Sequence, residues 1–226
     1  MSSVLIEARA LAFASFAVNP ECPRFHLRGV RVEYRDGHAV CIGTDGVVLL
    51  FARSSYETAP FEPFTLNFRK SGRLFVTCRK MGPMITIEVS ENGEAIWRLL
   101  RSNGSVIERG FVEQIDAFEA FPEWRFLLPE SPLHPAAVPV GVHPMPLRWI
   151  CRAVDNYQGD APCTLRLVSP GAELPAVVLI EGEPNVGGLI LPAFQDLNAE
   201  IVFPDWTMHA KAPAGEDKVE VTEDAA

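Results

Sequence analysis

Long apolar runs are absent from this chain of 226 residues. None approaches the roughly 18 consecutive apolar residues that a membrane-spanning helix needs. In the amino-terminal stretch MSSVLIEARALAFASFAV, Glu7 and Arg9 interrupt the region where the apolar core of a secretory signal would be continuous. The sequence therefore predicts a cytoplasmic protein with no membrane partner.

Paired cysteine motifs are also absent. The five cysteines are odd in number, widely spaced and never arranged as C-x-x-C, which excludes the usual signals of a disulfide framework and of a zinc site. They are predicted to be buried free thiols. These residues are Cys22, Cys41, Cys78, Cys151 and Cys163.

Catalytic signatures are lacking as well. The sequence has no Ser/His/Asp pattern, no Walker motif and no glycine-rich phosphate loop, and its five histidines have no metal-ligand spacing. We therefore predict no catalytic residue, no metal and no cofactor, and expect that the protein is not an enzyme. The four tryptophans are expected to pack in the core or in the connector rather than to stack on bases: Trp97, Trp124, Trp149 and Trp206.

An excess of positive charge is missing overall, because the formal net charge is −9. Nucleic-acid binding normally leaves a basic footprint, so the average composition argues against it. The charge is segregated, however. The stretch Arg69 to Lys80 holds five basic residues and no acidic one, and the remainder of the chain carries −14.

The spacing within this basic stretch predicts an amphipathic helix. At about 100° per residue, Arg69, Arg73 and Lys80 fall within about 40° of one another, opposite an apolar side of Leu74, Phe75, Cys78 and Met81. Val76 interrupts the basic face, and Gly72 weakens the helix. A second helix, PLRWICRAVDNY, places Arg148 and Arg152 opposite Leu147, Ile150, Cys151 and Val154.

Both basic faces have a plain interpretation as the solvated side of a helix on a sheet. The uniform sign on two helices favours a surface that meets phosphates.

The order of patterns along the chain predicts an α+β fold of repeated βαβββ units, about three in the chain. Strand, helix and three strands occur twice before a run of seven prolines between residues 121 and 146, and a similar unit follows the run. We therefore predict a two-unit domain at 1–120, a proline-rich connector at 121–139, a partial second domain at 140–194 and an acidic carboxy-terminal extension at 195–226.

Several short motifs, taken in order, resemble the DNA sliding clamp family, the beta subunit of the bacterial replicative polymerase. They are RFHLRGVRVEY, the Thr-Asp-Gly hairpin IGTDGVVLLFA, the connector FVEQIDAFEAFPEWRFLLPESP and the closing strand GGLILPAF, and the resemblance runs from about Leu5 to Phe194. The chain holds about three units, whereas a family subunit has six. The family's rings contain twelve, so four chains could close one.

The resemblance implies two sites and no enzymatic activity. One is a hydrophobic pocket for short peptide motifs of polymerases and repair proteins, formed here by Thr44, Gly46, Val48, Leu49, Pro129, Leu189, Leu191 and Pro192. The other is a sequence-independent contact with the double-stranded DNA backbone, through Arg69, Lys70, Arg73, Arg79, Lys80, Arg148 and Arg152.

Three functions remain open from the sequence. The leading one is a sliding-clamp-like accessory protein of DNA replication or repair, assembled as a homo-oligomer. The second is a clamp-like decoy or regulator that keeps the peptide pocket but does not encircle DNA. The third is an unrelated α+β ligand-binding protein.

Overall fold

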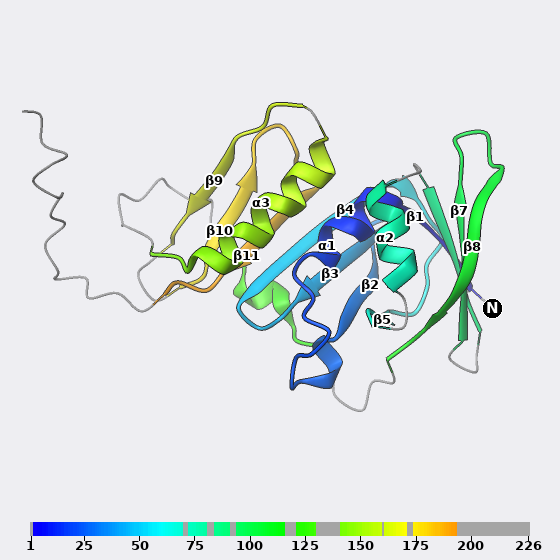
Figure 1. Ribbon diagram of the computed structural model, residues 1–226, viewed down its shortest axis with the longest axis horizontal. Helices are drawn as coiled ribbons and strands as arrows, with labels where there is room; N and C mark the ends of the chain where they lie inside the picture. The colour runs from blue at the N-terminus through cyan, green and yellow to red at the C-terminus, as the bar shows by residue number, and fades with distance from the viewer. Residues whose placement is uncertain are drawn as a thin grey trace, which may run out of the picture. The chain divides into compact units, whose positions relative to one another are not determined.

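The computed structural model describes residues 2–69, 72–80, 84–90, 94–115, 121–129, 141–159, 161–170 and 174–193, and the statements below concern these residues. The chain divides into two compact parts, 1–194 and 195–226. Residues 195–226, predicted as an acidic extension, lie outside the described residues. Figure 1 shows the arrangement of the helices and strands within 1–194.

Two units of strand, helix and three strands follow one another in the first half of the chain. The first unit consists of β1 (Ser2–Glu7), α1 (Ala8–Ser15), β2 (Gly29–Arg35), β3 (His38–Thr44) and β4 (Val48–Glu57). The second consists of β5 (Phe64–Asn67), α2 (Gly72–Lys80), β6 (Met84–Val89), β7 (Glu94–Leu100) and β8 (Val106–Glu113). The predicted repeat is therefore present.

A third, shorter unit follows the connector. It consists of α3 (Pro144–Gln158), β9 (Leu165–Val168), β10 (Ala176–Ile180) and β11 (Val186–Ile190). Of two short 3-10 helices, η1 (Phe25–Leu27) lies between α1 and β2 of the first unit, and η2 (Trp124–Leu127) lies between the second and third units. Within the described residues, no strand precedes α3 in the way that β1 precedes α1 and β5 precedes α2.

The strands form two antiparallel sheets. One has the order β1-β6-β7-β8, and the other has seven strands in the order β5-β2-β3-β4-β11-β10-β9. A bridge between Leu66 and Gln114, together with the hydrogen bond from Ile115 N to Thr65 O at 2.8 Å, links β5 to β8. The pairing of β4 with β11 joins the third unit to the first, so one sheet runs through both.

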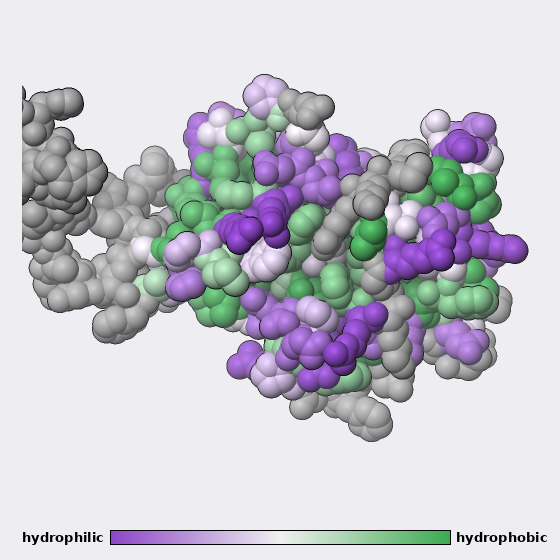
Figure 2. Space-filling model, in the orientation of Figure 1, coloured by the Kyte–Doolittle hydropathy of each residue, from purple (hydrophilic) through white to green (hydrophobic). Residues whose placement is uncertain are grey.

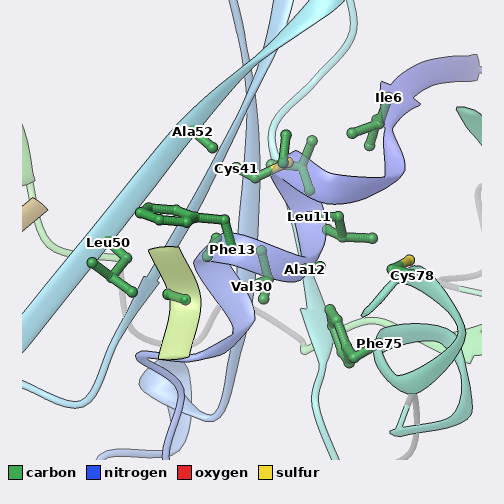
Figure 3. Packing of buried hydrophobic residues seen from close by; sticks show 14 of the residues in the cluster. Ile6, Leu11, Ala12, Phe13, Val30, Cys41, Leu50, Ala52, Phe75 and Cys78 are labelled. Atoms are coloured by element: carbon green, nitrogen blue, oxygen red, sulfur yellow. The ribbon is translucent and has the colours of Figure 1, made fainter. Parts of the chain in front are cut away.

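The helices cover one face of these strands, with α1 between α2 and α3 (Figure 1). Helix α1 is rich in alanine and is buried on nearly every side, because its small side chains allow close packing on both neighbouring helices. Phe13 reaches from α1 towards Leu50 and Ala52 of β4, and Phe75 and Cys78 of α2 face α1 (Figure 3). The main hydrophobic core lies between the sheets and the helices.

The structure corrects several sequence predictions of local structure. The alternating apolar residues from Phe25 to Tyr34 predict one strand with a bulge near Gly29, but residues 25–27 form a 3-10 turn, so the strand begins at Gly29 and pairs regularly with β3 and β5. The stretch VPVGVHP at residues 138–144 predicts another strand, but residues 141–143 do not form one, and residues 138–140 lie outside the described residues. Alternating apolar residues do not distinguish a strand from a tight turn that buries the same side chains.

The cysteine and tryptophan predictions are partly confirmed. Cys22, Cys41 and Cys78 are buried, but Cys151 and Cys163 are exposed, so the apolar side of α3 is formed without Cys151. Trp97 and Trp124 are buried as predicted, whereas Trp149 is 36% exposed and Trp206 lies outside the described residues.

Candidate functional site

The β3–β4 turn that the sequence singled out is held by its own side chains. The hydroxyl Oγ1 of Thr44 donates to the carbonyl of Val48 at 2.7 Å and accepts from the Gly46 N–H at 3.0 Å. Oδ1 of Asp45 accepts from the N–H groups of Val47 and Val48, both at 2.8 Å. Gly46 has a φ of +93°, which favours glycine. The Thr-Asp-Gly sequence therefore specifies a rigid turn.

The residues of the predicted pocket do not all share one face of the sheet. Val48 packs in the main core on the helix side, and its register partner on β11 is Ile190. Leu49 and its partner Leu189 point to the opposite side, because successive side chains of a strand alternate. Thr44 is buried as part of the turn, whereas Gly46 is exposed.

A second hydrophobic cluster covers Leu49 and Leu189, which are only 5% and 3% exposed. Trp124 of η2 stacks on Phe51 with ring centroids 5.1 Å apart, and its own side chain is buried. The remaining members of the cluster are Cys22, Leu27, Val40, Ile42, Phe121 and Val177, with Leu128 packed against it. The part of the predicted pocket formed by Leu49 and Leu189 is therefore filled by the connector.

The exposed part of the predicted pocket lies where β11 ends beside the turn. Leu191 N donates to the carbonyl of Val47 at 2.9 Å, and the side chains of both residues are 44% exposed. Pro129 and Pro192 are half-buried. Leu191 and Val47 thus form a small accessible apolar edge.

A cavity of about 660 Å³ lies beside the same turn. Asp45 and Val47 form one wall, the end of α1 with Phe16 and Val18 forms another, and Met145 and Trp149 of α3 close the third. His143 also lines it and caps α3, accepting from the Met145 N–H through Nδ1 at 3.2 Å. The cavity is mainly apolar and reaches solvent beside an exposed valine and an exposed tryptophan.

Two of the predicted DNA-contacting arginines of the second unit, Arg69 and Arg73, already have acidic partners. Arg69 lies before α2, which begins at Gly72, so the predicted common helical face does not include it. It pairs with Glu21 at 2.8 Å, and Arg73 pairs with Glu108 of β8 at 2.6 Å. Lys70 lies outside the described residues, and for Arg79 and Lys80 only the backbone is described.

The two arginines of α3 are exposed as predicted. Arg148 forms no ion pair with another described residue, and the guanidinium of Arg152 lies over the ring of Trp149 at 5.4 Å from its centroid. Figure 2 shows the helix-covered face, where hydrophilic side chains lie along α3 and below α1 in patches separated by hydrophobic ones. Within the described surface, these hydrophilic patches do not merge into one continuous stripe.

The sequence did not predict the residues that cover the peptide pocket or those that pair with the basic stretch. Trp124 was expected to pack, but not onto Phe51 above the pocket, and neither Glu21 nor Glu108 was connected with the basic stretch. Each of these contacts joins residues more than 30 positions apart, so no local spacing signals it.

None of the described helices is long and apolar enough to cross a membrane. Among the described residues, no three His, Cys, Asp or Glu side chains gather in a way that could hold a metal ion.

The comparisons with known proteins place the fold in a known class. No protein-family model and no curated protein matches the sequence. Solved structures do match. The DNA polymerase III beta subunit from Thermotoga maritima superposes with a TM-score of 0.63 at 11% identity, over 86% of this chain and 66% of that one.

Two further clamps give the same result over the same shares of both chains. The C. crescentus beta sliding clamp superposes with a TM-score of 0.65 and the Bartonella birtlesii clamp with 0.62, each at 14% identity. The protein therefore has the fold of a DNA sliding clamp. The chain spans about two thirds of the length of the clamps that it matches.

Proposed function

We propose that this protein is a sliding-clamp-like accessory factor of DNA replication or repair, which acts in the cytoplasm without catalysing a reaction. The observation that supports the proposal is the clamp fold over 86% of the chain, with helices covering one face of a sheet that runs from the first unit into the third. We propose that this helix-covered face meets the DNA backbone and that the region of the β3–β4 turn docks partner peptides.

The proposed DNA contact uses the arginines of α3 and the basic stretch that leads into α2. Arg148 and Arg152 are exposed on α3, and Arg73 on α2 is 81% exposed despite its pairing with Glu108. An exposed ion pair contributes about 1 kcal/mol or less, so a phosphate can replace the carboxylate at little cost. Contacts of this kind position a protein on DNA without reading its sequence.

The test is to measure the binding of two duplexes of equal length and unrelated sequence by fluorescence anisotropy. We expect equal affinities, with log K falling against log salt by about 0.9 for each phosphate that is contacted. The affinity will be low, because few positive charges act against a net charge of −9. A preference for one duplex, or binding that salt does not weaken, would contradict the proposed backbone contact.

The proposed peptide site is the accessible edge of Val47 and Leu191 together with the cavity beside the turn. The two leucines expected to line the pocket, Leu49 and Leu189, are covered, so an incoming apolar side chain has access to the edge and to the cavity wall of Met145 and Trp149. The Bartonella clamp was solved bound to griselimycin, and the C. crescentus clamp with PEG bound to a putative beta-motif tethering region. A peptide site on this protein is consistent with those structures.

Calorimetry with a clamp-binding peptide that carries a glutamine and two spaced hydrophobic residues tests this site. We expect a micromolar-scale affinity, on the order of −8 kcal/mol. Leu191→Lys should abolish binding because it places a charge at the edge, and Leu179→Lys is the matched control, since Leu179 is 40% exposed on β10. Equal loss in both variants, or no binding by the parent protein, would count against the site.

The alternative function is a peptide-binding decoy or regulator that does not encircle DNA. It is favoured by the acidic partners of Arg69 and Arg73, which reduce the positive potential beside α2. Peptide binding without any DNA binding at low salt would support this alternative over the clamp-like factor.

A further inference from the structure

The first two units of the chain complete each other by exchanging strands. The leading strand of each pairs with the first strand after the helix of the other, since β1 pairs with β6 and β5 pairs with β2. Helices α1 and α2 lie side by side as a result (Figure 1). The two units together therefore form a closed domain in which β2 and β6 both have neighbours on each side.

Among the described residues, the third unit has no such companion. Strand β9 is its first strand after the helix, as β2 and β6 are in theirs, and it lies at the edge of the seven-stranded sheet. Within the described residues, no strand pairs with its outer side. The side chains at equivalent positions of β2, β6 and β9 differ in their burial.

Each of these three strands points two alternate apolar side chains towards the helices. On β2 these are Val30 and Val32, and on β6 they are Ile85 and Ile87, all fully buried. On β9 they are Leu165 and Leu167, which are only half-buried against the same core. Strand β9 thus has the same alternation of apolar side chains as β2 and β6, but no described residue buries these side chains fully.

Helix α3 shows the same incompleteness. Its residues Met145, Trp149 and Tyr157 face α1, where Tyr157 packs edge-on against Phe13 with ring centroids 5.6 Å apart. The flank that points away from α1 carries half-buried Leu147 and Gln158 and exposed Cys151, without a charged group among them. A companion helix would cover this flank.

The charges that border this flank are self-complementary. Arg148 and Asp155 lie seven residues apart on the exposed side of α3, and neither forms an ion pair with a described residue. When two copies of α3 lie antiparallel about a twofold axis between residues 151 and 152, Arg148 of each copy faces Asp155 of the other. Because a twofold contact is isologous, each α3 helix contributes one arginine and one aspartate, and the contact contains two Arg148–Asp155 pairs.

We propose that a second copy of this chain covers the open flank of the third unit, with the two α3 helices antiparallel and the two β9 edges brought together. The α3 helix and the β9 edge of the second copy then cover the third unit, as α2 and β5 cover the first unit. The proposal rests on the fold and its internal repeat, and not on DNA or peptide binding.

The experiment is sedimentation equilibrium on the full chain with a charge exchange on α3. We expect a monomer–dimer equilibrium that Arg148→Asp and Asp155→Arg each weaken at least about fivefold, because each variant places like charges opposite one another. The double variant, which carries both changes, should regain the affinity of the parent. Arg101→Asp, an exposed arginine beyond β7, is the matched control and should leave the dimer unchanged.

Cysteine crosslinking gives an independent measurement on the same protein. Cys151 lies beside the proposed axis, so mild oxidation should produce a crosslinked dimer that Cys151→Ser removes and Cys163→Ser, at the other exposed cysteine, retains. A monomer at all accessible concentrations would overturn the proposal. So would a dimer that none of the α3 variants weakens and that does not crosslink through Cys151.

Discussion

At the scale of single residues, the close approach of α1 to β3 depends on the absence of a side chain at Gly43. A Cβ atom there would lie 2.0 Å from the carbonyl oxygen of Ala14 and 2.8 Å from its carbonyl carbon, which are backbone atoms that cannot turn aside. We expect Gly43→Ala to lower the stability by at least the roughly 1–3 kcal/mol typical of overpacked cores. Denaturant unfolding measures the loss.

The matched control for Gly43 is Gly37, which has a φ of +84° and open space around its Cβ position. Gly37→Ala carries only the conformational penalty of the left-handed region, about 1–2 kcal/mol. A loss at Gly43 no larger than the loss at Gly37 would show that α1 does not pack against β3 as closely as described.

Tyr157 gives a prediction about pH at the same scale. Burial raises the pKa of its hydroxyl to about 12, although the positive charge of Arg9 above its ring works in the opposite direction. Because the pKa is higher in the folded than in the unfolded state, the unfolded chain loses this proton first. The free energy of unfolding should therefore fall as the pH rises from about 10 towards 12.

Tyr157→Phe removes this titration and keeps the ring against Phe13. Over that pH range the variant should lose less stability than the parent protein, as measured by denaturant unfolding at a series of pH values. Equal losses of stability in the two proteins would contradict the assignment of the raised pKa to Tyr157.

At the scale of elements, the connector helix η2 decides whether the predicted pocket is open. Trp124 covers the cluster that contains Leu49 and Leu189, so Trp124→Ala should cost about 3–5 kcal/mol in the free energy of unfolding. Trp149→Ala is the matched control, because Trp149 is partly exposed on α3 and should cost less. Equal losses would mean that η2 does not seal the cluster.

The sequence predicted most elements because their patterns are local. The alternation in β6 and β7 and the proline at the start of α3 mark the elements directly. The alternating apolar residues at 25–27 were misleading, because a 3-10 turn buries Leu27 equally well.

The candidate site was less predictable than the fold. The turn at Thr44 to Gly46 could be inferred, since its hydrogen bonds are all within five residues. The cover over Leu49 could not, because it depends on Trp124, which is 75 residues away in the sequence, packing against Phe51. Long-range packing of this kind is decided by the whole fold.

At the scale of the whole molecule, the protein combines one closed domain with an additional unit that extends its sheet. The shared sheet and helix layer form a continuous face, which is the face proposed to meet the DNA backbone. For the proposed DNA contact, the net charge of −9 means that the position of the DNA should be decided by the few basic residues.

The most direct test of the clamp-like function reverses the charge of the predicted DNA-contacting residues Arg69, Arg73 and Lys80 by changing all three to glutamate. The control changes Arg35, Arg101 and Arg109 to glutamate, which alters the net charge equally at positions outside the helices.

Duplex binding at low salt is compared, with circular dichroism to confirm folding. We expect the first variant to lose at least about tenfold in affinity and the control to lose much less. Equal binding by the first variant and the parent protein, or no binding by either at any salt concentration, would contradict the claim that this face meets DNA.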